Sequence, residues 1–190
     1  MTKFLDGVLI FAALFVIFVK FDSLKLQICK TFGLTNFCYS YYRKQCSAGG
    51  KIDVCKYAVE LYANKKQYYA TMLSGFGCNS LGDGSMCFKT GYFTYRSYYT
   101  YRDDKNNYRM AQSSKDFAIK SWEKSCELKY SDGCFVLGRL YEYGEGVRQN
   151  LYKAEELYNK ACKLYNKENA DMLSCNNYYK KKLAEFKFLP

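Results

Sequence analysis

The residues of this chain with the most informative chemistry are its ten cysteines. The sequence contains no histidine that could act with them in catalysis or metal binding. Without histidine, Ser-His-Asp and Cys-His catalysis are excluded, and the commonest zinc ligand is missing. The sequence also has no Cys-x-x-Cys motif, which zinc ribbons and thioredoxins require. An even number of cysteines without metal-binding spacing indicates disulfides and an oxidising compartment. We therefore expect no metal and no cofactor.

The cysteines follow one another in five pairs of short separation. Within each pair the two residues are 8 to 13 positions apart, and the pairs are Cys29/Cys38, Cys46/Cys55, Cys78/Cys87, Cys126/Cys134 and Cys162/Cys175. Sequence alone does not fix disulfide connectivity, but local pairing across one turn is the simplest arrangement. Each such short loop would stabilise the fold by about 2.5 kcal/mol, because it restricts the unfolded chain.

An apolar run at residues 7–19 follows the short basic start of the chain and ends at Lys20. Its length suits the apolar region of a signal peptide and is short for a membrane-spanning helix. Asp6 and the lack of an Ala-x-Ala-like cleavage site after Lys20 leave an uncleaved anchor open as the alternative. We expect residues 1–22 to be a signal peptide or N-terminal membrane anchor, and the protein to be periplasmic or secreted. Membrane contact is expected only through residues 7–19, if they are retained.

A repeated segment positions the later cysteines. Residues 118–128 and 154–164 share Ala, Lys, Cys and Leu at one offset of 36 positions. A fixed period of this length is typical of a solenoid of helical hairpins. Gly144 is expected to end one helix in the left-handed conformation, and Gly138 to allow close approach of a partner helix that carries Ala154 and Ala161.

The same pattern recurs upstream in degraded form, around Cys46, Cys55 and Cys87. The single proline is the last residue, so nothing breaks helices internally. The sequence predicts an all-α fold, a right-handed α/α solenoid over residues 23–190 with one disulfide per hairpin. The approximate repeats are 36–67, 68–113, 114–149 and 150–190.

Five short segments together resemble the Sel1-like repeat family, in particular its cysteine-rich, exported Hcp-type members. They are Lys124-Ser125-Cys126-Glu127-Leu128, Asp132-Gly133-Cys134, Leu137-Gly138-Arg139-Leu140-Tyr141, Gly144-Glu145-Gly146-Val147 and Lys160-Ala161-Cys162. The resemblance implies TPR-like hairpins. It also implies the family label of β-lactamase or penicillin-binding protein, with β-lactam as a ligand and weak hydrolysis of its cyclic amide. The chain departs from the family pattern at Ala170, which stands where the last cysteine would fall, with Cys175 displaced.

Two serine-enzyme motifs occur literally but in the wrong chain order. Ser121 and Lys124 form a Ser-x-x-Lys motif, and Lys-Thr-Gly at residues 89–91 precedes it instead of following it. Residues of both motifs also fall at positions that the helical repeat explains, so no catalytic residue is assigned. Two hypotheses follow: a binding scaffold, or a true β-lactamase that hydrolyses penicillin and cephalosporin derivatives.

The net charge of +11 and the 21 tyrosines favour an anionic partner and an aromatic binding surface. Residues 102–115 are polar, occur once and are expected to form a projecting loop beside a tyrosine-rich stretch. For any single tyrosine, packing in the hairpin core is the alternative. The candidate surface comprises Tyr95, Tyr98, Tyr99, Tyr101, Arg102, Lys105 and Arg109. We expect an anionic cell-wall fragment or envelope protein as partner, and no nucleic acid.

Overall fold

The computed structural model describes residues 24–31, 36–165, 175 and 179, and all regular structure among them is helical. The chain divides into two compact units, residues 1–44 and 45–190. In the first unit, residues 24–31 are helical, and helix α2 (Asn36–Gln45) reaches the boundary. A disulfide between Cys29 and Cys38 joins these two helices, with a Cα–Cα distance of 5.3 Å.

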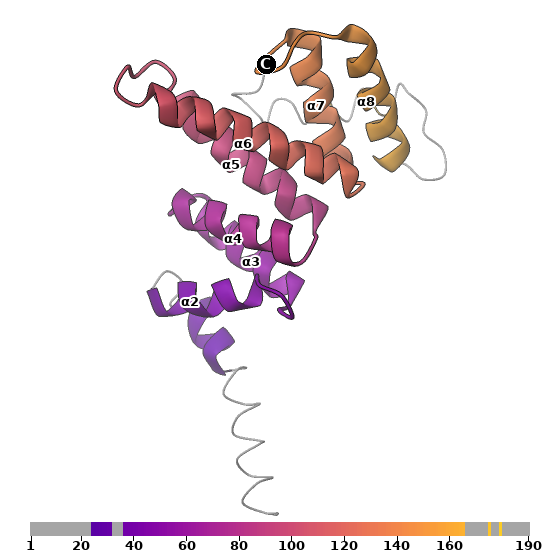
Figure 1. Ribbon diagram of the computed structural model, residues 1–190. Helices are drawn as coiled ribbons and strands as arrows, with labels where there is room; N and C mark the ends of the chain where they lie inside the picture. The colour runs from indigo at the N-terminus through magenta and orange to yellow at the C-terminus, as the bar shows by residue number, and fades with distance from the viewer. Residues whose placement is uncertain (1–23, 32–35, 166–174, 176–178, 180–190) are drawn as a thin grey trace, which may run out of the picture. The chain divides into compact units, whose positions relative to one another are not determined.

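The second unit is a succession of helices in which each packs on the next. The helices are α3 (Ile52–Ala63), α4 (Gln67–Ser80), α5 (Gly84–Tyr101), α6 (Tyr108–Glu127), α7 (Ser131–Tyr143) and α8 (Leu151–Tyr165). Helix α5 also contacts α7, so neighbouring hairpins stack on each other (Figure 1). The architecture is that of an α/α repeat, and the predicted fold class is confirmed.

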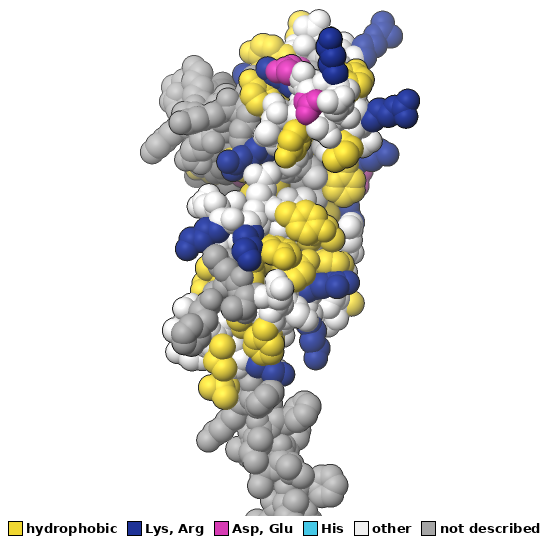
Figure 2. Space-filling model, turned by 90° about the vertical axis from the view of Figure 1, so that its left-hand side faces the viewer, with side chains coloured by type: hydrophobic (Ala, Val, Ile, Leu, Met, Phe, Trp, Pro, Cys, Tyr) yellow, Lys and Arg dark blue, Asp and Glu magenta, His cyan; other side chains and the backbone are white. Residues whose placement is uncertain are grey.

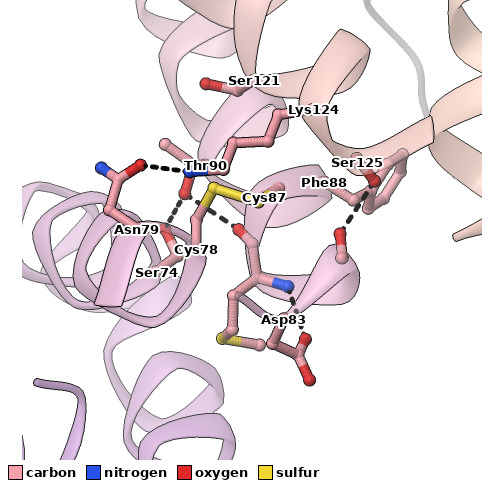
Figure 3. Close-up of a disulfide and its surroundings, with 12 residues drawn as sticks. Ser74, Cys78, Asn79, Asp83, Cys87, Phe88, Thr90, Ser121, Lys124 and Ser125 are labelled. Carbon is pink, nitrogen blue, oxygen red and sulfur yellow. Dashed lines mark hydrogen bonds between the residues drawn. A yellow bond between two sulfur atoms is a disulfide. The ribbon is translucent and has the colours of Figure 1, made fainter. Parts of the chain in front are cut away.

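All ten cysteines are paired, and none is free. The disulfides are Cys29–Cys38, Cys46–Cys55, Cys78–Cys87, Cys126–Cys134 and Cys162–Cys175, the same pairs that the spacing predicted. Cys78 lies in the last turn of α4 and Cys87 in the first turn of α5, so this bridge closes the turn between them (Figure 3). Disulfides of this number are typical of extracellular or periplasmic proteins.

Glycines let successive hairpins approach closely. Trp122 of α6 is fully buried and donates from Nε1 to the Phe88 carbonyl of α5 at 3.2 Å. A Cβ atom on Gly91 would lie 2.5 Å from the same Nε1. One repeat later, a Cβ atom on Gly138 would lie 2.6 Å from the ring of Tyr158. The close approach predicted at Gly138 is confirmed, and Trp122 and Tyr158 occupy equivalent positions 36 residues apart.

The contact between α3 and α4, one repeat earlier, does not follow this pairing of a large aromatic residue with a glycine. Each large aromatic stands four residues before a disulfide cysteine, and each glycine stands four residues after one. At these positions α4 carries Ser74 and α3 carries Val59, both fully buried. A small residue thus replaces the aromatic and a larger one replaces the glycine, so this contact is built from different residues than the two that follow it.

The loop predicted at residues 102–115 is shorter than expected. Only residues 102–107 lie outside regular helix, and α6 begins at Tyr108. Asp104 stabilises the turn by accepting hydrogen bonds from the Asn106 amide (2.9 Å) and the Asn107 side chain (2.7 Å). The prediction was wrong because this stretch has no glycine or proline, and because Ala111 is buried in the core when the helix continues.

None of the helices in the described ranges is long and apolar enough to span a bilayer. The apolar run at residues 7–19 lies outside the described residues.

Candidate binding groove along helix α5

Helix α5 is held firmly at its first turn by Asp83. This carboxylate accepts hydrogen bonds from the Met86 amide (3.0 Å) and the Ser85 hydroxyl (2.5 Å), and it pairs with Lys56 at 2.9 Å. Burial alone would raise the pKa of Asp83, but the bonds from Ser85, Lys56 and Met86 outweigh it and keep the pKa below its usual value. The carboxylate is therefore charged at neutral pH and caps the helix.

The tyrosines of α5 divide between core and surface. Tyr95 and Tyr98, both predicted as binding residues, are 2% and 7% exposed and belong to the core. The Tyr95 ring lies 5.3 Å from that of Trp122, and the Tyr98 hydroxyl donates to Glu145 at 3.4 Å. This part of the predicted surface was wrong, because both side chains turn toward the hydrophobic core that Trp122 of α6 fills. Burial, with the charge of Glu145, raises the pKa of Tyr95 far above its usual value.

The end of α5 does present predicted residues to solvent. Tyr99 and Tyr101 are 42% and 48% exposed, and the Arg102 guanidinium stacks 4.1 Å from the centre of the Tyr99 ring. Lys105 in the loop and Arg109 in the first turn of α6 are also exposed, but neither lines a hollow described below. Of the seven predicted residues, only Tyr101 lines one of these hollows, and Tyr99 and Arg102 lie beside it at the end of α5.

Two shallow hollows lie on either side of Arg96. The first, of about 500 Å³, lies between α4 and α5; its lining comprises Gln67, Tyr68, Thr71, Met72, Arg96, Ser97, Thr100 and Tyr101. The second, of about 370 Å³, brings together parts of α3, α5 and the start of α7; its lining includes Glu60, Lys89, Tyr92, Phe93, Arg96, Tyr130 and Asp132. Since Arg96 lines both, the hollows adjoin each other along α5. We call them together the α5 groove.

The walls of the groove are fixed by contacts between helices. The side-chain amide of Gln67, at the start of α4, donates to the Phe93 carbonyl (3.0 Å) and to the Ser97 hydroxyl (3.3 Å) of α5. Tyr68 and Met72 remain exposed on the α4 side. On the face where α5 ends and α6 begins, hydrophobic side chains lie among Lys and Arg, and few acidic groups are visible (Figure 2). The groove is therefore a preformed aromatic surface rather than a deep pocket.

The cations of the groove differ in their partners. Lys89 pairs with Glu60, and burial, with the nearby charge of Lys56, lowers the pKa of Lys89. Arg96 is exposed and forms no ion pair with any residue in the described part of the chain. Its guanidinium can therefore bind an incoming anion without breaking an existing pair, and it can do so through two parallel hydrogen bonds.

Sequence reasoning missed the α4 wall, and it treated Arg96 as a basic neighbour of the tyrosine stretch without including it in the candidate surface. Gln67, Tyr68 and Met72 belong to no motif, and they join the groove only because α4 packs beside α5. Arg96 carries a signal that could have been used. It is one of only two charged residues in α5, both of them basic, and it falls between tyrosines at helical spacing.

The serine motifs do not form a catalytic arrangement. The Ser121 hydroxyl is almost buried and donates to the Phe117 carbonyl one turn earlier at 2.8 Å. The Lys124 ammonium instead donates to Asn79 at 2.9 Å, and no hydrogen bond joins it to Ser121 (Figure 3). Thr90 of the Lys-Thr-Gly motif is buried and hydrogen-bonded to Ser74 (3.0 Å). A serine nucleophile needs a base within hydrogen-bond reach, and no such contact occurs at Ser121.

We expect a Ser121→Ala variant to keep whatever β-lactam turnover the parent protein shows, within about twofold. The hydroxyl only bonds its own helix, so its removal changes the free energy of unfolding by less than about 1 kcal/mol. Hydrolysis of a chromogenic cephalosporin and thermal unfolding of both proteins measure the two effects. Loss of turnover in a variant that unfolds at the parental temperature would contradict this structural role.

Helix pairs that stack in succession, with local disulfides between consecutive segments, define a cysteine-rich α/α repeat protein. Over 36 residues the chain is 56% identical to the Helicobacter pylori (strain J99) protein named "Putative beta-lactamase HcpC". It is 47% identical to "Putative beta-lactamase HcpD" of the same strain over a segment of equal length. Each match covers 19% of this chain and only 12% of the relative's length. No family model matches the chain.

Proposed function

We propose that this protein is an exported binding scaffold of Sel1-like repeats that holds anionic cell-wall fragments or envelope proteins in the α5 groove. The observation that carries the proposal is the position of Arg96, an exposed cation without an ion-pair partner in the described residues, between two aromatic hollows. Export is supported by the ten paired cysteines, since disulfides persist in oxidising compartments. The net charge of +11 favours encounter with an anionic partner.

A β-lactam-binding protein or β-lactamase is the second candidate, and it rests on the names of the two relatives. The groove offers a cation for the carboxylate of a β-lactam, but no activated nucleophile beside it. Binding without hydrolysis is therefore the form of this candidate that fits the groove. Equilibrium binding of a fluorescent penicillin to the native protein tests this form of the candidate. Label retained after denaturing electrophoresis would instead show covalent capture, and a parallel hydrolysis assay would show turnover; either result would contradict it.

An Arg96→Gln variant is expected to bind soluble cell-wall fragments roughly tenfold more weakly than the parent, equivalent to about 1.4 kcal/mol. The change removes the charge and the paired donors but keeps a polar side chain of similar reach. Binding is measured by isothermal titration of the oxidised protein at low and at physiological salt. The affinity of the parent should fall with salt, because exposed charges are screened.

Lys120→Gln provides the matched control for this experiment. It removes one positive charge from the exposed surface of α6 at a residue that lines neither hollow. Equal losses in the two variants would mean that net charge, rather than the α5 groove, governs binding. Both variants should unfold at the parental temperature, because each change is at the surface.

A further inference from the structure

We infer that the exposed face of α5 binds a linear polysaccharide that carries an acidic group on every second sugar. The inference names the ligand class of the α5 groove, so it rests on the function proposed above. It is carried by the order of side chains along the helix, in which cations and tyrosines alternate. Lys89, Tyr92 and Arg96 line the groove, and Tyr99 and the C-cap residue Arg102 continue the series beyond it.

The spacing of this series repeats every two helical turns. Lys89 and Arg96 are seven residues apart, and so are Tyr92 and Tyr99. Seven residues of α-helix span about 10 Å and return to nearly the same side of the helix. That span is close to the length of two sugar residues in an extended β-linked chain. A polymer with one acidic group per disaccharide could therefore place two successive acidic groups at Lys89 and Arg96, whereas Arg102, six residues after Arg96, lies about a third of a turn off this line.

The tyrosines between the cations suit the sugars between the acidic groups. A tyrosine ring offers a flat apolar face with a polar tip, and the faces of pyranose rings are lined by C–H groups. Tyr99 is exposed, and Arg102 stacks on it at 4.1 Å, which holds the ring against the helix end. Tyr92 is half-buried beside Phe93, with ring centres 5.6 Å apart. Both rings are thus held before a ligand arrives, which lowers the entropy lost on binding.

The charge around the series also selects an acidic polymer. Helix α5 contains no Asp or Glu. Two acidic groups lie beside the series, and each already pairs with a cation: Glu60 with Lys89, and Asp103 with Arg102 at 3.4 Å. Asp132, which also lines the groove, is buried at the start of α7. Arg96 is therefore the expected anchor, and Lys89 and Arg102 can exchange their exposed carboxylate partners for those of the ligand.

The experiment compares three oligosaccharides of equal length by fluorescence anisotropy with the oxidised full chain. The probes are labelled hyaluronan oligosaccharides (a carboxylate on every second sugar), oligogalacturonates (a carboxylate on every sugar) and neutral chitin oligosaccharides. Hyaluronan should bind most tightly, at least fivefold better than either competitor. Arg96→Gln and Tyr99→Ala should each weaken it roughly tenfold, whereas Lys120→Gln should leave it within twofold. Circular dichroism of each variant confirms that the fold is retained.

If oligogalacturonate bound more tightly than hyaluronan, the spacing of the acidic groups would not determine binding. If neutral chitin bound as tightly as hyaluronan, their charge would not. Either result would overturn the inference. Binding of single-stranded oligonucleotide or polyglutamate as tightly as hyaluronan would overturn it as well. If no oligosaccharide binds while cell-wall fragments still bind in an Arg96-dependent manner, the inference fails and the proposed function stands. If Arg96→Gln affects neither class of ligand, both fail.

Discussion

Reduction of the disulfides is expected to unfold the protein at 37 °C under conditions in which the oxidised form is fully helical. Each bridge closes a loop of 8 to 13 residues. In the chain-entropy treatment such a loop contributes about 2.5 kcal/mol. Five contributions of this size amount to about 12 kcal/mol, which is comparable to the whole stability of an ordinary domain, about 5–15 kcal/mol. Circular dichroism at 222 nm with and without a phosphine reductant, followed by alkylation and mass spectrometry, measures both the helicity and the number of free thiols.

Native protein should show no free thiol before reduction and ten afterwards. Two paired replacements refine the experiment. Cys126→Ala with Cys134→Ala removes a bridge in the second unit, whereas Cys29→Ala with Cys38→Ala removes the bridge of the first. Only the former should strongly lower the melting temperature of α3 to α8. A reduced protein that kept its helicity and melted at the parental temperature would show that packing alone maintains the fold.

A Trp122→Ala variant is expected to lose about 3–5 kcal/mol of stability, which is the usual cost of removing a large buried aromatic side chain. Trp122 is fully buried, contacts Tyr95 and donates a hydrogen bond to the Phe88 carbonyl of α5. Its loss leaves a cavity at the contact between α5 and α6 and removes the side-chain hydrogen bond that links the two helices. Urea unfolding followed by circular dichroism measures the change in free energy.

Two glycine variants test how closely α5 and α6 are packed at Trp122. Gly91→Ala places a methyl group 2.5 Å from the indole nitrogen of Trp122, so about 1–3 kcal/mol should be lost to overpacking. Gly75→Ala is the matched control, because its methyl group would lie 4.0 Å from Thr90 in ordinary contact. There the better helix propensity of alanine should add about 0.5–1 kcal/mol. Stabilisation by both changes would mean that the helices can move apart at no cost.

The sequence predicted the elements that depend on local periodicity, and it predicted the cysteine pairs because their partners are close in the chain. It did not predict features that depend on where a distant helix packs. Tyr95 and Tyr99 lie one turn apart on the same side of α5, yet Tyr95 packs against Trp122 of α6 and is buried, whereas Tyr99, nearer the end of the helix, is exposed. The α4 wall of the groove, formed around Tyr68 and Met72, lies more than twenty residues before Arg96 and belongs to no motif. The first two turns of α6 were missed because they carry many polar side chains and bury only small ones such as Ala111.

The strictly consecutive pairing of the cysteines has a consequence for how the protein is made. Each odd-numbered cysteine, counted along the chain, bonds the next one to follow it. A chain threaded through a translocation channel from its N-terminus exposes each cysteine and then its native partner before any later competitor appears. Closing a loop of about ten residues takes only some 10–100 ns, so each cysteine meets its native partner often, while the oxidation itself takes seconds or longer. If the chain is exported in this way, rapid oxidation at the exit of the channel would favour the native pairs, and the need for an isomerase to correct mispaired thiols would be small.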